Sequence, residues 1–419
     1  MKLFITTVFL FPFGLSGQDI MLVNEAKNVI SVASDKNGGY YFLSRQDTPN
    51  TAIFNRNSSG SLTKLVQSTD VDISPLTLHS QNEWIAGDKD IAYFPVYDPR
   101  VFTASRPKSA HLYKYQNGKI APVLKIGDEI SFLALDGSIQ KEYFYHAIHL
   151  IISGGNRIIL VAATGKKPFG LNTELIFHIF ELSNDKIIQI ITPLDKAILN
   201  SSIISRIFSG ETTKNNFWGF EGSYGTSTES VYKTGLNRLR KKVLSGVNLM
   251  DVSRSHSLGT LLTHTAPYEG GIRTNEDSAI IAYRNPQTGN FHFSRFKDNS
   301  DVEESILNVK SIDNHTIGAS RRHAYSNDGS YYFVMDTIGG EGLFKIKDNK
   351  GQLLKIISGQ IDGKIEQIVE SAGKIYLVIK SGLSGNSIYA IIKPIFGPDK
   401  VSGMPNDLIE ACSDCVNPG

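Results

Sequence analysis

The chain has few cysteines, and this scarcity removes several classes of protein. Of its 419 residues only Cys412 and Cys415 are cysteine, spaced C-x-x-C near the C-terminus. The fold therefore does not depend on a disulfide framework. A zinc site needs about four ligands, and no second cysteine pair is there to complete one. We expect a small terminal disulfide, although pairing of Cys412 or Cys415 with a partner chain would fit the same spacing.

The chain also has almost no net charge. The chain carries 43 lysine and arginine residues against 41 aspartate and glutamate residues, for a formal net charge of +2. A nucleic-acid-binding protein needs a basic face, so this balance argues against nucleic acid as a partner. One local basic cluster lies beside alternating apolar residues, and we expect it to be a solvated strand or hairpin tip. Its members are Arg238, Arg240, Lys241 and Lys242.

No apolar run is long enough to cross a membrane. The longest, Leu3–Leu15, follows the positive charge of Lys2 and precedes the small residues Ser16 and Gly17. This order is that of a secretory signal peptide, and the run is too short for a membrane helix. We expect residues 1–17 to be a signal peptide and Gln18 to begin the mature chain. The protein is then exported, extracellular or periplasmic, without a transmembrane segment.

What the sequence does contain is a repeat of short apolar segments rich in Ile, Val, Tyr and Phe, separated by Gly, Asn, Asp and Ser. Each unit has an apolar strand, a polar loop, a second strand, a tight turn and a third strand. The turns lie roughly 50 to 60 residues apart, a period typical of propellers rather than β-helices. They are expected near residues 60, 118, 185, 237, 289, 351 and 397.

Some of these strands are apolar at successive positions, which adds a second argument for the fold. Arg157–Val161 and Lys374–Ile379 do not alternate with polar residues, so both faces of such strands should be buried. Sheets stacked face to face bury strands in this way. We predict an all-β, seven-bladed β-propeller over residues 18–403, with six or eight blades as alternatives, and a C-terminal tail over 404–419. Ring closure should place Ile20–Val23 in the last blade as its fourth strand.

One turn carries a resemblance to a known kind of repeat. The segment Tyr325–Phe333, with Ser326, Asp328 and Gly329, resembles the S-x-D-G turn and apolar strand of TolB-type and WD-like propeller repeats. Weaker copies occur at Ser34–Gly39 and Ser371–Gly373. In such a turn the aspartate caps its own backbone and the glycine takes the positive φ. The resemblance implies a binding platform, and the repeat itself carries no catalytic residues.

Catalytic motifs are missing. No G-x-S-x-G, P-loop or dinucleotide fingerprint occurs in a supporting strand and helix context, so we expect no cofactor. His146 and His149 could bind metal on a helix, but their neighbours are strand-like, which should point them to opposite faces. We therefore expect packing or hydrogen-bonded roles for both histidines, and no metal site.

Binding residues are expected on loops between second and third strands, which share one face of a propeller. Two segments, Tyr97–Lys108 and His264–Asn275, are rich in aromatic and cationic groups that suit protein or glycan contacts. The candidate ligand-binding residues are Tyr97, Arg100, Phe102, Arg106, Tyr224, Tyr268 and Arg273.

The function expected from these features is that of an exported, monomeric binding module for a protein or carbohydrate ligand. The alternative is a secreted propeller enzyme, a hydrolase or lyase that cleaves glycan or peptide. Such an enzyme needs two catalytic carboxylates that act together. These would come from different blades, so the sequence alone does not show which two acids meet.

Overall fold

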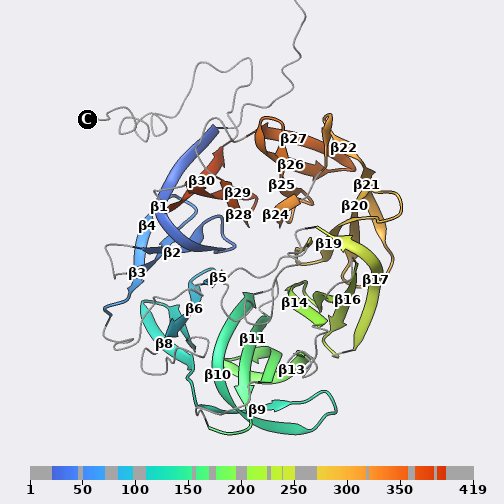
Figure 1. Cartoon of the computed structure of the whole chain (residues 1–419). Coiled ribbons are helices and arrows are strands. Elements are labelled where there is room, and N and C mark those ends of the chain that lie inside the picture. Colours follow the sequence, from blue (N-terminus) through green and yellow to red (C-terminus); the bar gives the residue numbers. More distant parts are fainter. Residues whose placement is uncertain are drawn as a thin grey trace, which may run out of the picture.

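The computed structural model contains only β-strands and their connections among the residues it describes (Figure 1). No helix long and apolar enough to cross a membrane occurs in that part of the chain. The predicted signal peptide, most of the predicted ligand-binding residues, Cys412 and Cys415 lie outside it. The described residues are 21–45, 51–70, 84–97, 110–152, 157–168, 176–194, 205–223, 228–237, 239–250, 271–317, 320–356, 364–381 and 385–392.

Within these residues the strands form seven four-stranded antiparallel blades arranged in a ring, which confirms the predicted β-propeller (Figure 1). Blade 1 has β1 (Met21–Ser34), β2 (Tyr40–Arg45), β3 (Thr51–Arg56) and β4 (Leu62–Gln67), and blade 2 has β5 (Ala86–Asp88), β6 (Ile91–Tyr97), β7 (Ala110–Gln116) and β8 (Lys119–Leu124). Blade 3 has β10 (Ile139–Ile152), β11 (Ile158–Gly165), β12 (Ile176–Ser183) and β13 (Lys186–Leu194), and blade 4 has β14 (Ser205–Thr212), β15 (Asn216–Ser223), β16 (Glu229–Gly235) and β17 (Arg240–Leu249).

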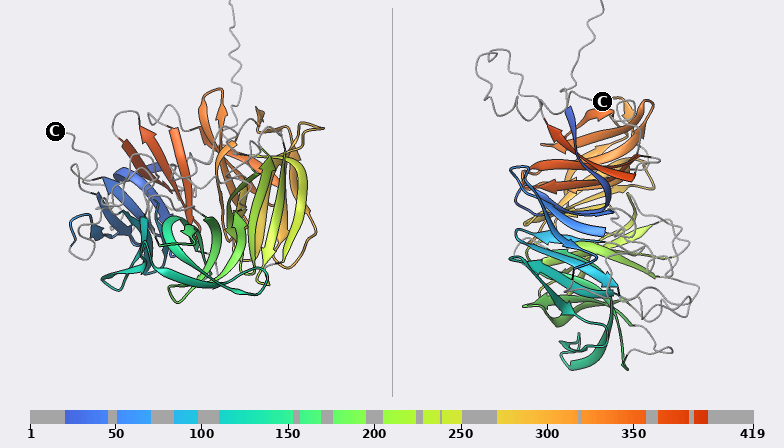
Figure 2. Two further views of the ribbon diagram at one scale, coloured as in Figure 1. Left: turned by 60° about the horizontal axis from the view of Figure 1, so that its bottom comes forward. Right: turned by 90° about the vertical axis from the view of Figure 1, so that its left-hand side faces the viewer.

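The remaining blades follow the same order around the ring, and in the tilted view of Figure 2 their strands run across its thickness. Blade 5 has β18 (Ile272–Thr274), β19 (Ser278–Arg284), β20 (Phe291–Lys297) and β21 (Glu304–Val309), and blade 6 has β24 (Ser320–Tyr325), β25 (Tyr331–Thr337), β26 (Gly340–Lys347) and β27 (Lys350–Ile356). Blade 7 has β28 (Lys364–Ser371), β29 (Lys374–Ser381) and β30 (Gly385–Ile392), completed by part of β1.

The long strand β1 closes the ring. Its first part pairs antiparallel with β30, with Met21 opposite Ile392 and Val23 opposite Ala390. Its second part pairs with β2 as the inner strand of blade 1. The prediction that the segment up to Val23 completes the last blade is confirmed for its described residues, 21–23. Both ends of the ring thus share one strand, seen where blue β1 meets red β30 in Figure 1.

The blades are held face to face by apolar side chains. Among the described residues there are seven buried hydrophobic clusters, and each joins one blade to the next. In β2, for example, Tyr41 and Leu43 pack toward blade 2, while Tyr40 and Phe42 pack toward blade 7. Successive residues therefore enter different cores, which is the physical reason why the strands read as continuous apolar runs.

Two parts of the repeat differ from the sequence prediction. The turns predicted near residues 60, 118, 185, 237 and 351 join the third and fourth strands of their blades, whereas in blade 5 the turn near residue 289 joins the second and third strands, β19 and β20, and β21 follows as the fourth. The first strand predicted for this blade, residues 260–262, lies outside the described residues. Blade 3 carries an additional strand, β9 (Glu129–Leu133), which pairs with β10 and, at one residue pair, with β13. Two short strands, β22 (Ser311–Ile312) and β23 (His315–Thr316), form a hairpin between blades 5 and 6.

Candidate functional site

The antiparallel order of each blade gives the ring two different faces. The turns between first and second strands and between third and fourth strands open on one face, here called the turn face. The connections between second and third strands, and from the fourth strand to the next blade, open on the opposite face, here called the loop face. Between the described strands, the connections of more than ten residues are 68–85, 98–109 and 250–271, and the strand ends that they join lie at the loop face.

On the turn face the predicted S-x-D-G turn forms as expected. In blade 6, Oδ1 of Asp328 accepts the backbone N–H of Ser330 at 2.9 Å, and Gly329 has φ 81°. In blade 1, Oδ1 of Asp35 accepts the N–H groups of Asn37 and Gly39 at 2.7 and 2.8 Å. The local chemistry of these turns was therefore predictable from the motif.

The same turns also join neighbouring blades. Asp35 of blade 1 accepts a hydrogen bond from Oγ of Ser371 in blade 7, at 3.0 Å. Its backbone carbonyl accepts the N–H of Lys89 in blade 2 at 2.7 Å. Between blades 6 and 7, Oγ of Ser326 donates to Oε1 of Glu370 at 3.0 Å. The turn face is thus a set of short turns whose polar groups are used in holding blades together.

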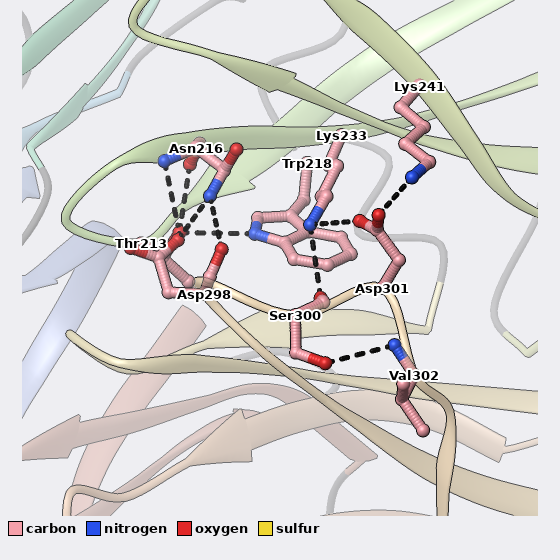
Figure 3. A network of polar contacts seen from close by, with 9 residues as sticks. All are labelled: Thr213, Asn216, Trp218, Lys233, Lys241, Asp298, Ser300, Asp301 and Val302. Carbon is pink, nitrogen blue, oxygen red and sulfur yellow. Dashed lines mark hydrogen bonds and ion pairs between the residues drawn. The ribbon is translucent and has the colours of Figure 1, made fainter.

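The seam between blades 4 and 5 shows the same use of polar groups on a larger scale (Figure 3). Asp298, in the turn after β20, is buried. Its carboxylate accepts hydrogen bonds from Asn215 and Asn216, both Nδ2 distances being 2.6 Å, and from the hydroxyl of Thr213. Nε1 of Trp218 in turn donates to that hydroxyl oxygen at 3.1 Å. A buried carboxylate with this many hydrogen-bond donors fixes the two turns against each other.

Two of the predicted ligand-binding residues lie in the described part, at the loop-face ends of strands. Tyr97 ends β6 and is 4% exposed, and Arg273 lies in β18 and is 5% exposed. The sequence placed both on exposed loops, whereas the structure places them on strands beneath the loops. Arg100, Phe102, Arg106, Tyr224 and Tyr268 lie outside the described residues. The segment 251–270 lies between β17, the fourth strand of blade 4, and β18, the first strand of blade 5, and therefore does not join second and third strands as predicted.

Arg273 links the inner strands of blades 5 and 6. Its Nε donates to the backbone carbonyl of His323 at 2.8 Å, and Nη1 donates to the carbonyl of Ile272. His323 is buried and shares a 2.7 Å hydrogen bond with the hydroxyl of Tyr331. Burial, together with the charges of Arg273 and Arg322, lowers the pKa of His323 well below its ordinary value. The imidazole is therefore neutral at physiological pH.

A polar cluster in blade 3 was not singled out in the sequence. The carboxylate of Glu142 is buried and accepts hydrogen bonds from Thr164 (2.5 Å), Lys166 (2.6 Å) and Nε2 of His178 (3.1 Å). Burial alone would raise the pKa of Glu142, but these hydrogen bonds together lower it to about 2. The signal in the sequence is one glutamate inside the mostly apolar strand 139–152, since a buried carboxylate needs partners.

His146 has the hydrogen-bonded role that was expected. It is buried, and its Nδ1 accepts the N–H of Ala110 at 3.0 Å. A β-bulge at Ile148 shifts the register, so that positions 146 and 149 pair with Ala163 and Val161 of β11. The side chain of His149 lies outside the described part of the chain, so the expected opposite placement of the two histidines stays a prediction. Among the described residues no cluster of His, Cys, Asp and Glu is arranged to hold a metal ion.

Comparison with known proteins bears on the fold alone. No family model and no curated protein sequence matches the chain. An acylaminoacyl peptidase from Pyrococcus horikoshii matches with TM-score 0.51 and 10% identity, over 88% of this chain and 51% of that one. An acylaminoacyl peptidase in complex with Z-Gly-Gly-Phe-chloromethyl ketone matches with the same score and identity, over 92% and 54%.

A third solved structure, an oligogalacturonate lyase in complex with manganese, has TM-score 0.47 and 9% identity, over 90% of this chain and 92% of the lyase. At that score it supports no argument. This chain spans about half the length of the two peptidase chains. The blades, their ring closure and the similarity to the two peptidase structures define the chain as a β-propeller.

Proposed function

We propose that this protein is an exported, non-catalytic binding module that recognises a protein or a glycan through its loop face. The observation that supports this most directly is the difference between the two faces. Turn-face polar groups such as Asp35 and Asp298 hold neighbouring blades together. The strand ends joined by connections of more than ten residues, among them 98–109 and 250–271, lie at the opposite face, where a rigid scaffold can present variable side chains to a ligand.

The residues in those connections fit such contacts. Residues 98–109 contain Arg100, Phe102 and Arg106, and residues 251–270 contain Tyr268. Aromatic and arginine side chains dominate the binding energy of protein contacts, and aromatic rings also suit the apolar faces of sugars. Tyr97 and Arg273 support this face from below, because they are buried at the ends of β6 and β18.

The test is binding of the full chain to a glycan array and to an array of secreted proteins. The variant Arg100→Ala/Tyr268→Ala should lose most of the signal on the ligands that the wild type binds. Lys350→Ala, an exposed substitution on the turn face, serves as the matched control and should leave it unchanged. Equal binding by the wild type and the loop variant removes the loop face from the proposal.

A second candidate is an enzyme that cleaves glycan or peptide, and the contact between Glu142 and His178 favours it. A carboxylate beside an imidazole can take part in general acid–base chemistry. Glu142, however, is 1% exposed and is held as an anion by three donors. Turnover of polysaccharides or peptides by the wild type, abolished in Glu142→Gln with binding retained, would favour the enzyme over the binding module.

A further inference from the structure

The sequence has two Asn-Gly pairs, and both lie in turns on the turn face. Asn37–Gly38 lies between β1 and β2, and Asn117–Gly118 lies between β7 and β8. In such a pair the side-chain amide can react with the backbone of the same chain, because glycine has no Cβ to keep the next backbone nitrogen away from the asparagine side chain. The surroundings of each turn therefore decide which of the two pairs reacts.

The Asn117–Gly118 turn is open to solvent. Both residues are exposed, and a Cβ added to Gly118 would meet no heavy atom within 4 Å. Within the described part of the chain, no hydrogen bond holds the side chain of Asn117 or the N–H of Gly118. Their φ angles of 52° and 76° are those of a type I′ hairpin turn. Local opening of such a hairpin tip breaks few contacts, so this turn can move without disturbing the blade.

The Asn37–Gly38 turn, in contrast, is fixed at the seam between blades 1 and 7. Gly38 is buried, and its N–H donates to Oγ of Ser371 at 3.0 Å. Its carbonyl accepts the hydroxyl of Tyr376 at 2.7 Å. The N–H of Asn37 donates to Oδ1 of Asp35, also at 2.7 Å. The backbone nitrogen next to the Asn37 side chain is thus held by a bond that crosses to another blade.

We propose that Asn117 is a site of spontaneous deamidation, and that the bond from Gly38 to Ser371 protects Asn37 from the same reaction. The backbone nitrogen of Gly118 gives its proton to water or hydroxide and attacks Cγ of Asn117. A cyclic succinimide forms, and the side-chain amide group takes up a proton and leaves as ammonia. Water then opens the ring at either of its two carbonyl carbons, which gives aspartate or isoaspartate. Water is the only co-reactant, so the inference does not rest on the proposed binding function.

The modification changes both the charge and the shape of the hairpin. A carboxylate replaces a neutral amide, so the formal net charge of +2 falls by one unit. In isoaspartate the main chain runs through the former side chain, which lengthens the turn between Gln116 and Lys119, the first pair of the ladder. The two positive φ angles of this turn match the twist of its strands, and a longer turn loses that match. The tip of the β7–β8 hairpin should therefore loosen as the protein ages.

The experiment incubates the folded full chain in mildly basic buffer and follows both Asn-Gly pairs by peptide mass spectrometry. The mass gain from amide to acid should appear about tenfold faster at Asn117 than at Asn37, because Asn37 reacts only when its seam opens. In wild-type protein unfolded in urea both pairs should react at similar rates, since the bond from Gly38 to Ser371 is then broken. Isoelectric focusing gives a second readout, the appearance of a more acidic form.

Two variants test the cause. Ser371→Ala removes the acceptor of the Gly38 N–H and should raise the rate at Asn37 about threefold or more, with the rate at Asn117 unchanged. Asn117→Gly tolerates the positive φ and should abolish the acidic product of this hairpin.

Circular dichroism and melting temperature verify that both variants fold, and the comparison of folded with urea-unfolded wild type stands without them. The proposal fails if Asn117 stays an amide in the folded chain while it reacts in the unfolded one. It also fails if Asn37 reacts as fast as Asn117 in the folded wild type, or if folded Ser371→Ala leaves the rate at Asn37 unchanged.

Discussion

Oγ of Ser371 donates a hydrogen bond to Oδ1 of Asp35 at 3.0 Å and accepts one from the backbone N–H of Gly38, also at 3.0 Å. Both bonds cross from the last blade to the first, and Ser371 is fully buried. Ser371→Ala removes them and leaves polar groups of Asp35 and Gly38 without this partner. We expect the free energy of unfolding to fall by about 1 to 3 kcal/mol. Urea unfolding measures this free energy. The control is Ser245→Ala at an exposed position, which should change the free energy of unfolding by less than about 0.5 kcal/mol. Equal losses in the two variants would contradict this role.

Deletion of residues 18–24 tests ring closure by β1. The deletion removes the pairs of Met21 with Ile392 and of Val23 with Ala390 and keeps those of Ala26 and Val29, so most of the β30 edge loses its partner. The melting temperature should fall by at least about 4 °C, since each lost kcal/mol lowers it by a few degrees in a large domain. Deletion of the tail 404–419, predicted to lie outside the propeller, is the control. An unchanged melting temperature in the first deletion would mean that the ring is closed without this strand.

Asp298 and Asp301 lie three residues apart in one turn, yet their substitutions should differ in effect. Asp298 is buried and accepts hydrogen bonds from Thr213, Asn215 and Asn216. Asp298→Ala should lower the free energy of unfolding by about 3 kcal/mol, because several buried donors lose their acceptor. Asp301 is partly exposed and accepts hydrogen bonds from Lys233 and Lys241, so Asp301→Ala should lower the free energy of unfolding by at most about 1 kcal/mol. Denaturant unfolding of both variants measures the two losses. Similar losses of unfolding free energy in Asp298→Ala and Asp301→Ala would contradict the network in Figure 3.

His146 should make stability depend on pH in a mildly acidic range. Burial lowers the pKa of His146 to about 4 from an ordinary 6.5. Between these values the unfolded chain binds a proton that the folded chain does not, so stability falls as the pH drops below 6.5. The loss from this residue between pH 7 and pH 5 should be about 2 kcal/mol. His146→Gln should show a correspondingly smaller fall over that interval in urea unfolding. The same fall in the variant as in the wild type would show that other groups cause it.

The sequence predicted the blades better than it predicted the site. Local patterns predict local structure, and the turns around Asp35 and Asp328 formed as the motif indicates. Their bonds to other blades were not predictable, because the partner of Asp35 lies 336 positions away in Ser371. The β-bulge at Ile148, which shifts the pairing register between Ala147 and His149, was not predictable either, because one additional residue in a strand leaves no clear pattern.

The candidate site was predicted less well because exposure depends on tertiary structure. Tyr97 and Arg273 have the side chains of a binding loop, yet both are buried, Tyr97 at the end of β6 and Arg273 within β18. Glu142 and His178 lie on separate strands and meet only when β10 and β12 are assembled around β11. The basic segment at 240–242 was visible in the sequence, but the stacking of Arg240 on Tyr232 depends on the register of the hairpin.

Because β1 belongs to both the first and the last blade, the ring closes only after the last strand of the chain has been synthesised. A ribosome makes Met21–Val29 first and their partner β30 last. Until then this segment and the growing ring carry open backbone edges, which can pair with another chain. A nascent chain of this architecture therefore depends on rapid chain completion or on a chaperone, and premature termination before residue 385 should yield aggregates rather than a smaller ring.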